Sequence, residues 1–434
     1  MRIFGVSALA VLTGMLSAEA LEVTDVTARQ RWPWNGVVDI DYTVGGASAG
    51  AVYAISVTAV WQGGEKTLAG RTFLTEPVGK GGVNSLAWDF GKDAPGVKAE
   101  DLRISVTATP FSDATEVYMA IDLSGGKDAK RYPVRYSTAR PEMSVGGNDA
   151  CKTTELWLRR IHPAGRDFAF SKTTPADGNS SFGVRLTKDY YIAIFETTQQ
   201  QWYQLKGEWV SRMSNETYRA TRPLDNFFIS RLYNQSAWQW PDSKTLASTS
   251  LLQKLRDRTG LKTLNLTTES QWQFAAGAGP MTGTGCDRYL DPDGKQYALD
   301  DIARSASNCG DYSNDLCDPS SGSACVGSYA PNAFGLYDMI GNVCEVCVDP
   351  YVAHDKIKPY WTDKGAEFPL VDYEGLPQSD AKSISGSLRT TLRGSSFRKN
   401  AGTCTLWNRE SGYQNYAADN AAYAHGCRFA VTCE

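Results

Sequence analysis

Ten cysteine thiols are the most reactive side chains of this sequence, and all of them lie beyond residue 150. Two of them form the segment Cys344-Glu345-Val346-Cys347. A thioredoxin-like use of this pair is disfavoured, because no helix N-terminus is predicted there to lower a thiol pKa. An even number of cysteines favours disulfides in an exported chain, although the sequence leaves their connectivity open. The ten are Cys151, Cys286, Cys309, Cys317, Cys325, Cys344, Cys347, Cys404, Cys427 and Cys433.

Histidine and phosphate-binding patterns give no further catalytic hypothesis. Only three histidines occur, His162, His354 and His425, and they lie far apart without a metal-ligand spacing. No Gly-x-x-x-x-Gly-Lys loop is present to bind a nucleotide phosphate. Carboxylates are plentiful, but the sequence alone places no pair of them on opposite sides of a substrate.

Length, composition and charge define the class of protein. A chain of 434 residues is long enough for two or three domains. Hydrophobic residues make up 42% and charged residues 21%, so the chain can bury a sizeable core and is not disordered. The net charge is −4, and no dense run of Lys and Arg occurs. Nucleic-acid binding is therefore not expected.

The first twenty residues read as a cleaved export signal of bacterial type. Arg2 supplies the positive charge, Ile3 to Leu16 is almost entirely apolar, and Ala18-Glu19-Ala20 matches the small-x-small cleavage pattern. The apolar stretch of about 14 residues is too short to span a bilayer, and no later segment is longer. We therefore expect a secreted or periplasmic protein that begins near residue 21 and has no membrane span.

Residues 21–112 are predicted to form an all-β sandwich of immunoglobulin-like type. Apolar residues alternate with polar ones around Val38–Val44, Tyr53–Trp61 and Leu102–Ala108, which is typical of strands with one buried face. Gly-rich turns separate these runs. The segment has no cluster of titratable groups, so we interpret it as a spacer or recognition module. Residues 113–154 are predicted to be a linker that could include strands.

The second part, residues 155–434, is rich in Trp, Tyr and Cys and has few predicted helices. Thr198 with Gln201, and Thr268 with Gln271, form capping boxes that predict two helix starts. A third helix is expected to begin at Ser248 or Thr249 and to end at Gly260. A domain with so much loop should need stabilisation by disulfides or bound ions. The predicted fold class is α+β.

The order of motifs in this second part resembles the formylglycine-generating enzyme, or sulfatase-modifying factor, family. The resemblance extends over roughly residues 155–434. It rests on several segments in a fixed order, which makes it specific. These segments are Leu186–Ile192, Phe195–Gln199 with Trp202, Arg222-Pro223 with Asn226, Leu264–Trp272, Pro331–Val343, Leu392–Phe397 and Gly426–Ala430.

This resemblance implies a loop-rich, C-type lectin-like fold and a calcium site in the loop after Gly335-Leu336-Tyr337-Asp338. The carboxylates of Asp338 and Glu345, with the carbonyls of Gly341 and Val343, would be the ligands. Oxygen ligands at this short spacing suit Ca²⁺ better than zinc. The alternative is that the two acidic residues merely solvate a loop.

The enzymes of this family use copper held by two cysteines five residues apart to oxidise a substrate cysteine. By alignment on Arg393–Phe397, Ser396 matches the family's serine and Cys404 the second cysteine, but the first cysteine position is Lys399. An ammonium group cannot replace a thiolate ligand of Cu(I), so oxidase activity is in doubt. Cys344 or Cys347 could act as a substitute copper ligand beside Cys404, or could form a disulfide, even with Cys404 itself; an exported chain favours the disulfide.

The C-terminal stretch is the candidate binding surface. Tyr, Asn and Ser give binding loops contact area and hydrogen bonds at low entropic cost. The stretch lies where variable proteins of diversity-generating retroelements, which share this fold, carry their diversified segment. An ordinary polar loop is the alternative. The residues are Asn400, Trp407, Asn408, Tyr413, Asn415, Tyr416 and Tyr423.

Two functions are compatible with these motifs. The favoured one is an exported protein that binds a protein or glycan ligand on a calcium- and disulfide-stabilised scaffold, with the oxidase site lost. The other is a divergent copper-dependent oxidase acting on a cysteine of a sulfatase client. In that case Cys404 and Ser396 would be catalytic.

Overall fold

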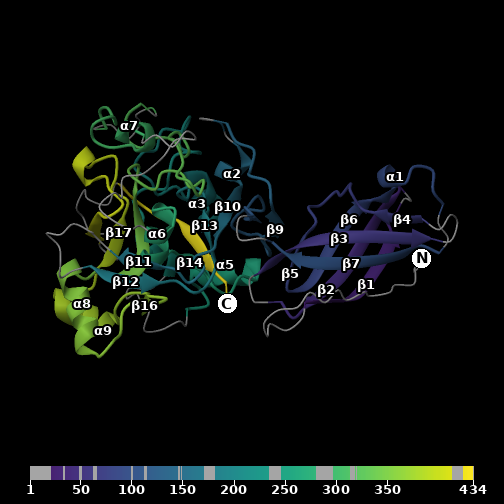
Figure 1. The fold of residues 1–434 in the computed structure, drawn as a ribbon. Coiled ribbons are helices and arrows are strands. Elements are labelled where there is room, and N and C mark those ends of the chain that lie inside the picture. The colour runs from purple at the N-terminus through teal and green to yellow at the C-terminus, as the bar shows by residue number, and fades with distance from the viewer. Residues whose placement is uncertain are drawn as a thin grey trace. The chain divides into compact units, whose positions relative to one another are not determined.

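The computed structural model describes residues 21–32, 35–47, 51–61, 66–98, 101–111, 115–144, 147, 149–170, 181–233, 246–279, 297–312, 318, 320–412 and 424–433. The predicted export signal, residues 1–20, lies outside the described residues, as do Cys286, Cys317 and the four tyrosines and asparagines predicted for the binding surface beyond residue 412. The chain divides into two compact units (Figure 1). One contains the described residues up to 117 with 136–139 and 433, and the other contains 118–135 and 140–432.

The first unit is built from two antiparallel sheets. One has the order β1 (Glu22–Gln30), β2 (Val37–Gly45), β6 (Gly82–Asp89). In the other, β3 (Val52–Trp61) pairs with β4 (Lys66–Ala69), β5 (Val78–Lys80) and β7 (Arg103–Pro110), and the short helix α1 (Phe90–Asp93) follows β6. The inward-facing residues of both sheets form one apolar core, as the period-two pattern predicted. This packing is compatible with the predicted sandwich.

A six-stranded sheet forms the centre of the second unit. Its order is β14 (Leu264–Leu266), β20 (Phe429–Thr432), β13 (Tyr190–Ala193), β10 (Glu155–Ile161), β8 (Tyr118–Asp122) and β9 (Val134–Ser137). Strands β10, β13 and β20 pair antiparallel with their neighbours. Strand β20, the last of the described strands, thus lies inside the sheet between β14 and β13, which brings residues separated by more than 200 positions together.

Two smaller sheets complete the unit. In one, β11 (Asp167–Phe170) pairs with β12 (Phe182–Arg185), which pairs with β16 (Leu370–Val371). The other has the order β18 (Arg409–Gly412), β17 (Thr390–Arg393), β15 (Cys344–Pro350), β19 (His425–Gly426). Predicted site residues lie in the loop before β15 and in the loop after its neighbour β17, so this sheet positions the candidate site.

Two helices begin where the capping boxes of the sequence predicted them to begin. Both capping boxes are confirmed, at α3 (Gln199–Lys206) and α6 (Glu269–Ala276). Helix α5 (Leu251–Thr259) ends at Gly260 in the left-handed conformation, as expected, but it begins after Ser250 rather than Ser248 or Thr249, because the Ser250 hydroxyl caps the Gln253 N–H. The others are α2 (Ala150–Thr153), α4 (Ile229–Tyr233), α7 (Leu299–Ile302), α8 (His354–Asp363), α9 (Gln378–Ser385) and the 3₁₀ turn Ala401–Thr403.

The expected disulfides do not form among the eight described cysteines, all of which are buried. A continuous apolar core extends through the second unit. Buried arginines bridge its loops: Arg222, Arg393 and Arg428 each have no exposed side-chain surface. Apolar burial and charge-assisted hydrogen bonds therefore hold the loops where cross-links were predicted.

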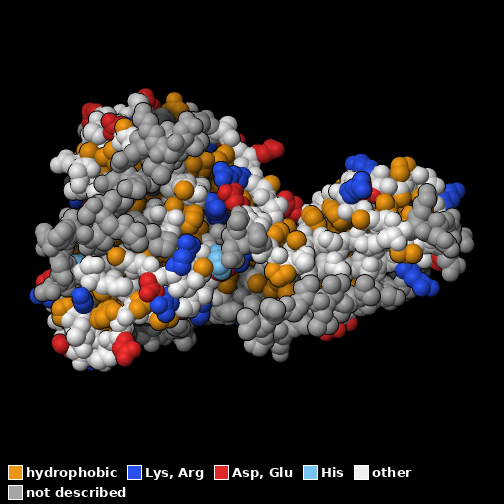
Figure 2. Space-filling model, viewed as in Figure 1, with side chains coloured by type: hydrophobic (Ala, Val, Ile, Leu, Met, Phe, Trp, Pro, Cys, Tyr) orange, Lys and Arg blue, Asp and Glu red, His pale blue; other side chains and the backbone are white. Residues whose placement is uncertain are grey.

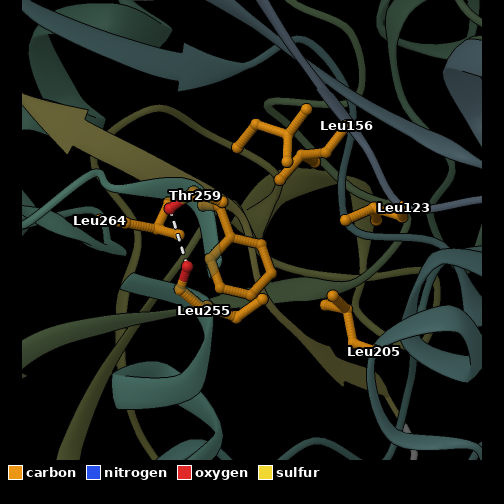
Figure 3. A pocket seen from close by; sticks show the side chains of 8 residues that line it. Leu123, Leu156, Leu205, Leu255, Thr259 and Leu264 are labelled. Atoms are coloured by element: carbon orange, nitrogen blue, oxygen red, sulfur yellow. Dashed lines mark hydrogen bonds between the residues drawn. The ribbon is translucent and has the colours of Figure 1, made fainter. Parts of the chain in front are cut away.

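A cavity lies between the central sheet and helices α3 and α5 (Figure 3). It holds only about 10 Å³, close to the space of a single water molecule. Its lining side chains are apolar except for Thr259, whose hydroxyl is already used, since it donates to the Leu255 carbonyl at 2.7 Å. The cavity is thus a packing gap and too small for an organic ligand. Its lining residues are Ile121, Leu123, Leu156, Leu205, Leu255, Thr259, Leu264 and Phe429.

Two further observations concern the hydropathy of the helices and the charge on the surface. Across the described ranges, no helix is long and apolar enough to cross a membrane. On the face shown in Figure 2, basic and acidic side chains of the larger unit are interspersed rather than gathered into one basic patch.

Candidate functional site

Strand β15 separates the predicted site residues into two groups. Residues three apart on a strand point to opposite faces, because side chains alternate with a period of two. Cys344 and Cys347 therefore face different surroundings. Glu345 pairs with Arg393 of β17, and Cys344 pairs with His425 of β19. The loops before β15 and after β17 carry the remaining predicted ligands.

The Glu345 carboxylate is held by a buried arginine that was not predicted from the sequence. Arg428 Nε donates to both Glu345 oxygens at 2.9 and 3.0 Å, and its Nη2 donates to Oε1 at 2.6 Å. The Trp272 indole N–H donates to Oε2 at 2.8 Å. The remaining Arg428 donors bind the carbonyls of Ala193 and Tyr337, each at 2.8 Å. Arg428 thus ties the last strand of the chain to β13, β15 and the Tyr337 loop.

Two more carboxylates share this buried region, Asp338 and Glu196. Asp338 Oδ2 accepts the Gly327 N–H at 2.7 Å, whereas its Oδ1 is buried without a hydrogen-bond partner. Burial raises the pKa of Asp338 to about 6, although Gly327 and Arg428 act to lower it. Glu196 accepts hydrogen bonds from Asn342 and Val343. Burial, with Asp338 and Glu345 nearby, raises the pKa of Glu196 well above its usual value.

The predicted calcium ligands can be tested against this arrangement. The Oδ1 of Asp338 has no hydrogen-bond partner, and the three buried carboxylates of Asp338, Glu196 and Glu345 lie close together, with the cations of Arg428 and Lys152 near them. Glu345 is less available than expected, since its oxygens already accept from Arg428 and Trp272. No three His, Cys, Asp or Glu side chains within the described ranges converge as a metal site. The unpartnered Oδ1 of Asp338 therefore fits one ligand position of a calcium site, whereas the Glu345 carboxylate is already bound by Arg428.

The thiols of Cys344, the first residue of β15, and Cys404 lie close enough for their charges to interact. Both are buried, with 2% and 3% of their surfaces exposed. The Ser396 hydroxyl hydrogen-bonds the Cys344 thiol, and that of Ser395 hydrogen-bonds Cys404. Burial raises the pKa of both thiols, and the Glu410 carboxylate raises it further. These thiols therefore favour the protonated form, a poor metal ligand and a poor nucleophile.

Lys399 completes this thiol cluster. Its ammonium group forms an ion pair with Glu410 at 2.8 Å, and Glu410 also accepts from the Asn408 amide at 2.8 Å. The Glu410 hydrogen bond raises the pKa of Lys399, so the lysine stays charged. The position that would carry the first copper ligand is thus occupied by a cation neutralised within the protein.

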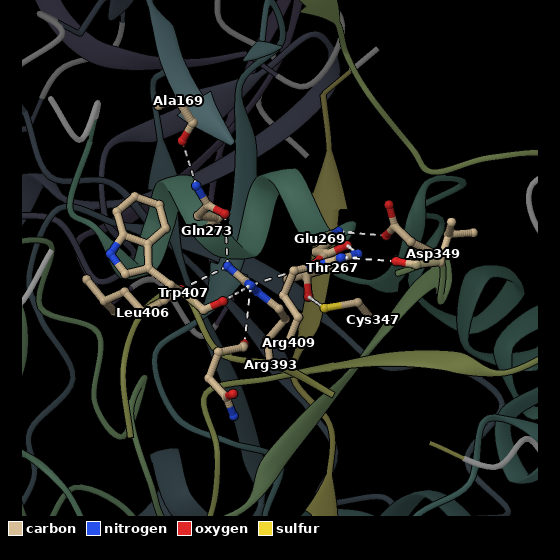
Figure 4. A network of polar contacts seen from close by, with 12 residues as sticks. Ala169, Thr267, Glu269, Gln273, Cys347, Asp349, Arg393, Leu406, Trp407 and Arg409 are labelled. Carbon is tan, nitrogen blue, oxygen red and sulfur yellow. Dashed lines mark hydrogen bonds and ion pairs between the residues drawn. The ribbon is translucent and has the colours of Figure 1, made fainter. Parts of the chain in front are cut away.

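Cys347 interacts with other groups than Cys344 does, and of the two it is Cys344 that interacts with Cys404. The Cys347 thiol lies 3.7 Å from the Thr267 hydroxyl. It faces the network in Figure 4, where Glu269 is bound by Arg409, with one N–H···O contact of 2.8 Å, and lies 3.6 Å from Arg393. Burial acts to raise the pKa of Glu269, but the charges of Arg409 and Arg393 outweigh this effect, so the pKa is lower than usual. This network joins α6 to β17 and β18 and is structural.

The predicted binding surface is only partly described. Asn400 is exposed, and Asn408 is half-buried and bonded to Glu410. Trp407 was expected on the surface, but only 7% of it is exposed, because its ring packs into the apolar core and its carbonyl accepts from Arg393 at 3.2 Å. Tyr413, Asn415, Tyr416 and Tyr423 lie outside the described residues.

Three site residues were missed by sequence reasoning: Glu196, Glu410 and Arg428. Glu196 and Arg428 act on partners far away in the chain, Asn342 at 146 positions and Glu345 at 83, whereas Glu410 pairs with the nearby Lys399. Arg428 lies in the Gly426–Ala430 motif that was quoted for the resemblance, so its position was known but its partner was not.

Comparison with known proteins gives one family match and several distant structural likenesses. The model of the sulfatase-modifying factor enzyme 1-like domain matches residues 163–432. No curated protein sequence matches the chain.

Three solved structures show a distant likeness to the chain. Treponema denticola variable protein 1 is 19% identical, with 67% of this chain and 97% of that chain covered at a TM-score of 0.40. PvdO from Pseudomonas aeruginosa is 17% identical, with 68% and 99% covered at a TM-score of 0.42. CarF is 16% identical, with 64% and 99% covered at a TM-score of 0.34.

Proposed function

Since the chain belongs to the sulfatase-modifying factor enzyme 1-like family, we propose that it is a binding protein on this family's scaffold, without the copper-dependent oxidase site. The observation that supports this most is the Lys399–Glu410 ion pair in the place of a copper-ligating thiolate. Loss of one of two soft ligands removes the charge and the sulfur that hold Cu(I). The remaining thiols, Cys344 and Cys404, have raised pKa values that disfavour thiolate.

The proposal includes the parts of the chain around this site. The export signal would deliver the protein outside the cytoplasm, and the sandwich, of immunoglobulin-like type, would act as a spacer or recognition module. A calcium ion at Asp338, with the carbonyls of Gly341 and Val343 and the charge of Glu345, would neutralise the buried acidic region and stabilise its loops. Asn400, which is exposed, would contact a protein or glycan ligand together with the other residues predicted for the binding surface.

A ligand screen tests the binding role. The mature chain would be applied to glycan and peptide arrays beside an Asn400→Arg variant, which places a bulky cation on the proposed surface. The proposal expects a hit that Asn400→Arg loses and that a Lys80→Glu variant on the sandwich keeps. A hit that persists in Asn400→Arg would place the binding surface elsewhere.

One observation favours the second candidate, a divergent copper oxidase: Cys344 lies beside Cys404 with Ser396 bonded to it. Two thiolates from these residues could hold Cu(I) despite Lys399. No comparison points to a sulfatase client.

Copper titration separates the two candidates. Cu(I) would be titrated against the reduced protein in competition with a chromophoric chelator, using Cys344→Ser, Cys404→Ser and Cys347→Ser variants. The binding proposal expects no tight stoichiometric copper in any of them. Tight binding that is lost in Cys344→Ser and Cys404→Ser but kept in Cys347→Ser would favour the oxidase.

A further inference from the structure

Glu196 is a fully buried carboxylate that the function proposed above does not use. It lies in the loop between β13 and α3, two residues before the helix cap Thr198, and has no exposed surface. A buried carboxylate is costly unless hydrogen bonds and a positive charge compensate it. The contacts of Glu196 therefore need an explanation.

Both Glu196 oxygens hold the turn that contains the expected calcium carbonyls. Oε1 accepts the Val343 N–H at 2.9 Å, and Oε2 accepts the Asn342 side-chain N–H at 2.6 Å. The Asn342 side-chain oxygen in turn accepts the Ala324 N–H at 2.9 Å. The side chains of Glu196 and Asn342 thus connect three loops around the Gly341–Val343 turn.

The backbone of this turn is unusual and needs such support. Asp338, Gly341 and Asn342 all have positive φ angles, of 56°, 78° and 55°. A side chain at Gly341 would place its Cβ 2.3 Å from the Arg304 carbonyl oxygen, so only glycine fits there. Left-handed conformations at non-glycine residues persist when the surrounding contacts hold them. Glu196 supplies two of those contacts.

Glu196 lies close to the other two buried carboxylates, Asp338 and Glu345. Both of its oxygens already accept hydrogen bonds, so toward a metal it would hold the turn rather than act as a ligand. The cations of this region are Arg428, which binds Glu345, and Lys152, which acts on Asp338. The buried Oδ1 of Asp338 remains without a hydrogen-bond partner and is the carboxylate oxygen that a divalent cation would meet.

We propose that Glu196 is a positioning residue for the calcium site, which fixes the Gly341–Val343 turn through its hydrogen bonds with Asn342 and Val343. This inference rests on the calcium site proposed above. Residues behind metal ligands commonly change metal affinity by about 10–100-fold when they are altered. Glu196 should have an effect of this size, although its only contact with an expected calcium ligand is the hydrogen bond that it accepts from the Val343 backbone N–H.

Two single variants and one exchange test the contact. Glu196→Gln keeps the shape but turns an N–H₂ group toward a donor, and Asn342→Ala removes the same contact from the other side. The double variant Glu196→Gln/Asn342→Asp exchanges the amide and the carboxylate, which restores the hydrogen bond and the net charge. Asp225→Asn is the matched control, because Asp225 is also fully buried and its carboxylate accepts two backbone N–H groups, at 2.5 and 3.1 Å.

Calcium affinity would be measured on the mature chain by calorimetric titration with Ca²⁺ and by Tb³⁺ luminescence. Trp272, whose indole bonds Glu345, is a suitable sensitiser for the latter. Melting curves in EDTA report folding separately. We expect Glu196→Gln and Asn342→Ala to weaken Ca²⁺ binding by about 10–100-fold, the exchanged pair to recover most of it, and Asp225→Asn to bind as the wild type does.

Contradictory outcomes are distinguishable. If the wild-type chain binds neither Ca²⁺ nor Tb³⁺, the calcium site itself is wrong and the role of Glu196 falls with it. If the wild type binds but Glu196→Gln and Asn342→Ala bind equally well, only the positioning role is refuted. Equal weakening by Asp225→Asn would also refute it, since the effect would then be a general loss of packing.

Discussion

Replacing Arg428 by methionine should destabilise the second unit severely. The substitution keeps an unbranched apolar stem but removes a guanidinium that donates to Glu345, Ala193 and Tyr337. The Arg428 and Glu345 side chains are 0% and 1% exposed. Breaking a buried ion pair by removing one partner costs about 3–5 kcal/mol, because the other charge stays buried without compensation. The carbonyls of Ala193 and Tyr337, which would lose their donor, add about 1 kcal/mol each.

The expected loss of about 5–7 kcal/mol is comparable with the whole stability of a domain, typically about 5–15 kcal/mol. A surface pair provides the control. Arg135 lies 2.9 Å from Glu155, nearly as close as Arg428 to Glu345, but half of its side chain is exposed. Arg135→Met should therefore cost less than about 1 kcal/mol, since solvent screens the pair.

Urea unfolding in EDTA, followed by circular dichroism, measures both variants. A third variant, Arg428→Met/Glu345→Leu, removes both charges and should recover a large part of the loss, because a well-packed apolar pair can replace a buried ion pair. If Arg428→Met costs no more than Arg135→Met, burial does not strengthen the Arg428–Glu345 pair and the electrostatic reasoning about this site is wrong.

Two further predictions concern acid stability and the thiols. Burial acts to raise the pKa of Asp93, but hydrogen bonds from Arg71, Trp88 and Thr72 outweigh it and lower that pKa to about 2. A depressed folded pKa gives stability that is present above the unfolded value near 4 and is lost as the pH falls toward 2. Asp93→Asn should thus cost about 1–2 kcal/mol at pH 7 and almost nothing at pH 2, and a cost independent of pH in urea titrations would refute this. Mass spectrometry after alkylation should find Cys344 and Cys404 unmodified in the native protein and both alkylated in denaturant without reductant; a disulfide between them would contradict the structure.

Local features of the fold were predictable from the sequence, whereas long-range contacts were not. Capping boxes at Thr198 and Thr268 depend on residues three positions apart, so their chemistry is visible in the sequence. The start of α5 was misplaced because Ser248, Thr249 and Ser250 can all act as a cap, and the apolar face alone does not choose among them. Alternation in the first unit predicted its buried faces for the same local reason.

The candidate site shows the limit of sequence reasoning more clearly. The resemblance indicated Asp338, Glu345 and Cys404, but it did not reveal that Arg428 neutralises Glu345 or that Glu410 neutralises Lys399. Cys344 and Cys347 were equivalent by spacing, and only the pleat of β15 separates them. Trp407 was predicted to be exposed from its polar neighbours, although its large apolar surface is buried in the core.

The central claim is that Lys399, paired with Glu410, leaves this scaffold without oxidase activity. The most direct measurement incubates the copper-loaded mature protein with a cysteine-containing peptide and a reductant in oxygenated buffer, and detects formylglycine by mass spectrometry. We expect no product above a copper-only control and no oxygen consumption beyond that control. Oxygen-dependent conversion that disappears in Cys404→Ser would contradict the claim and establish the protein as a divergent oxidase.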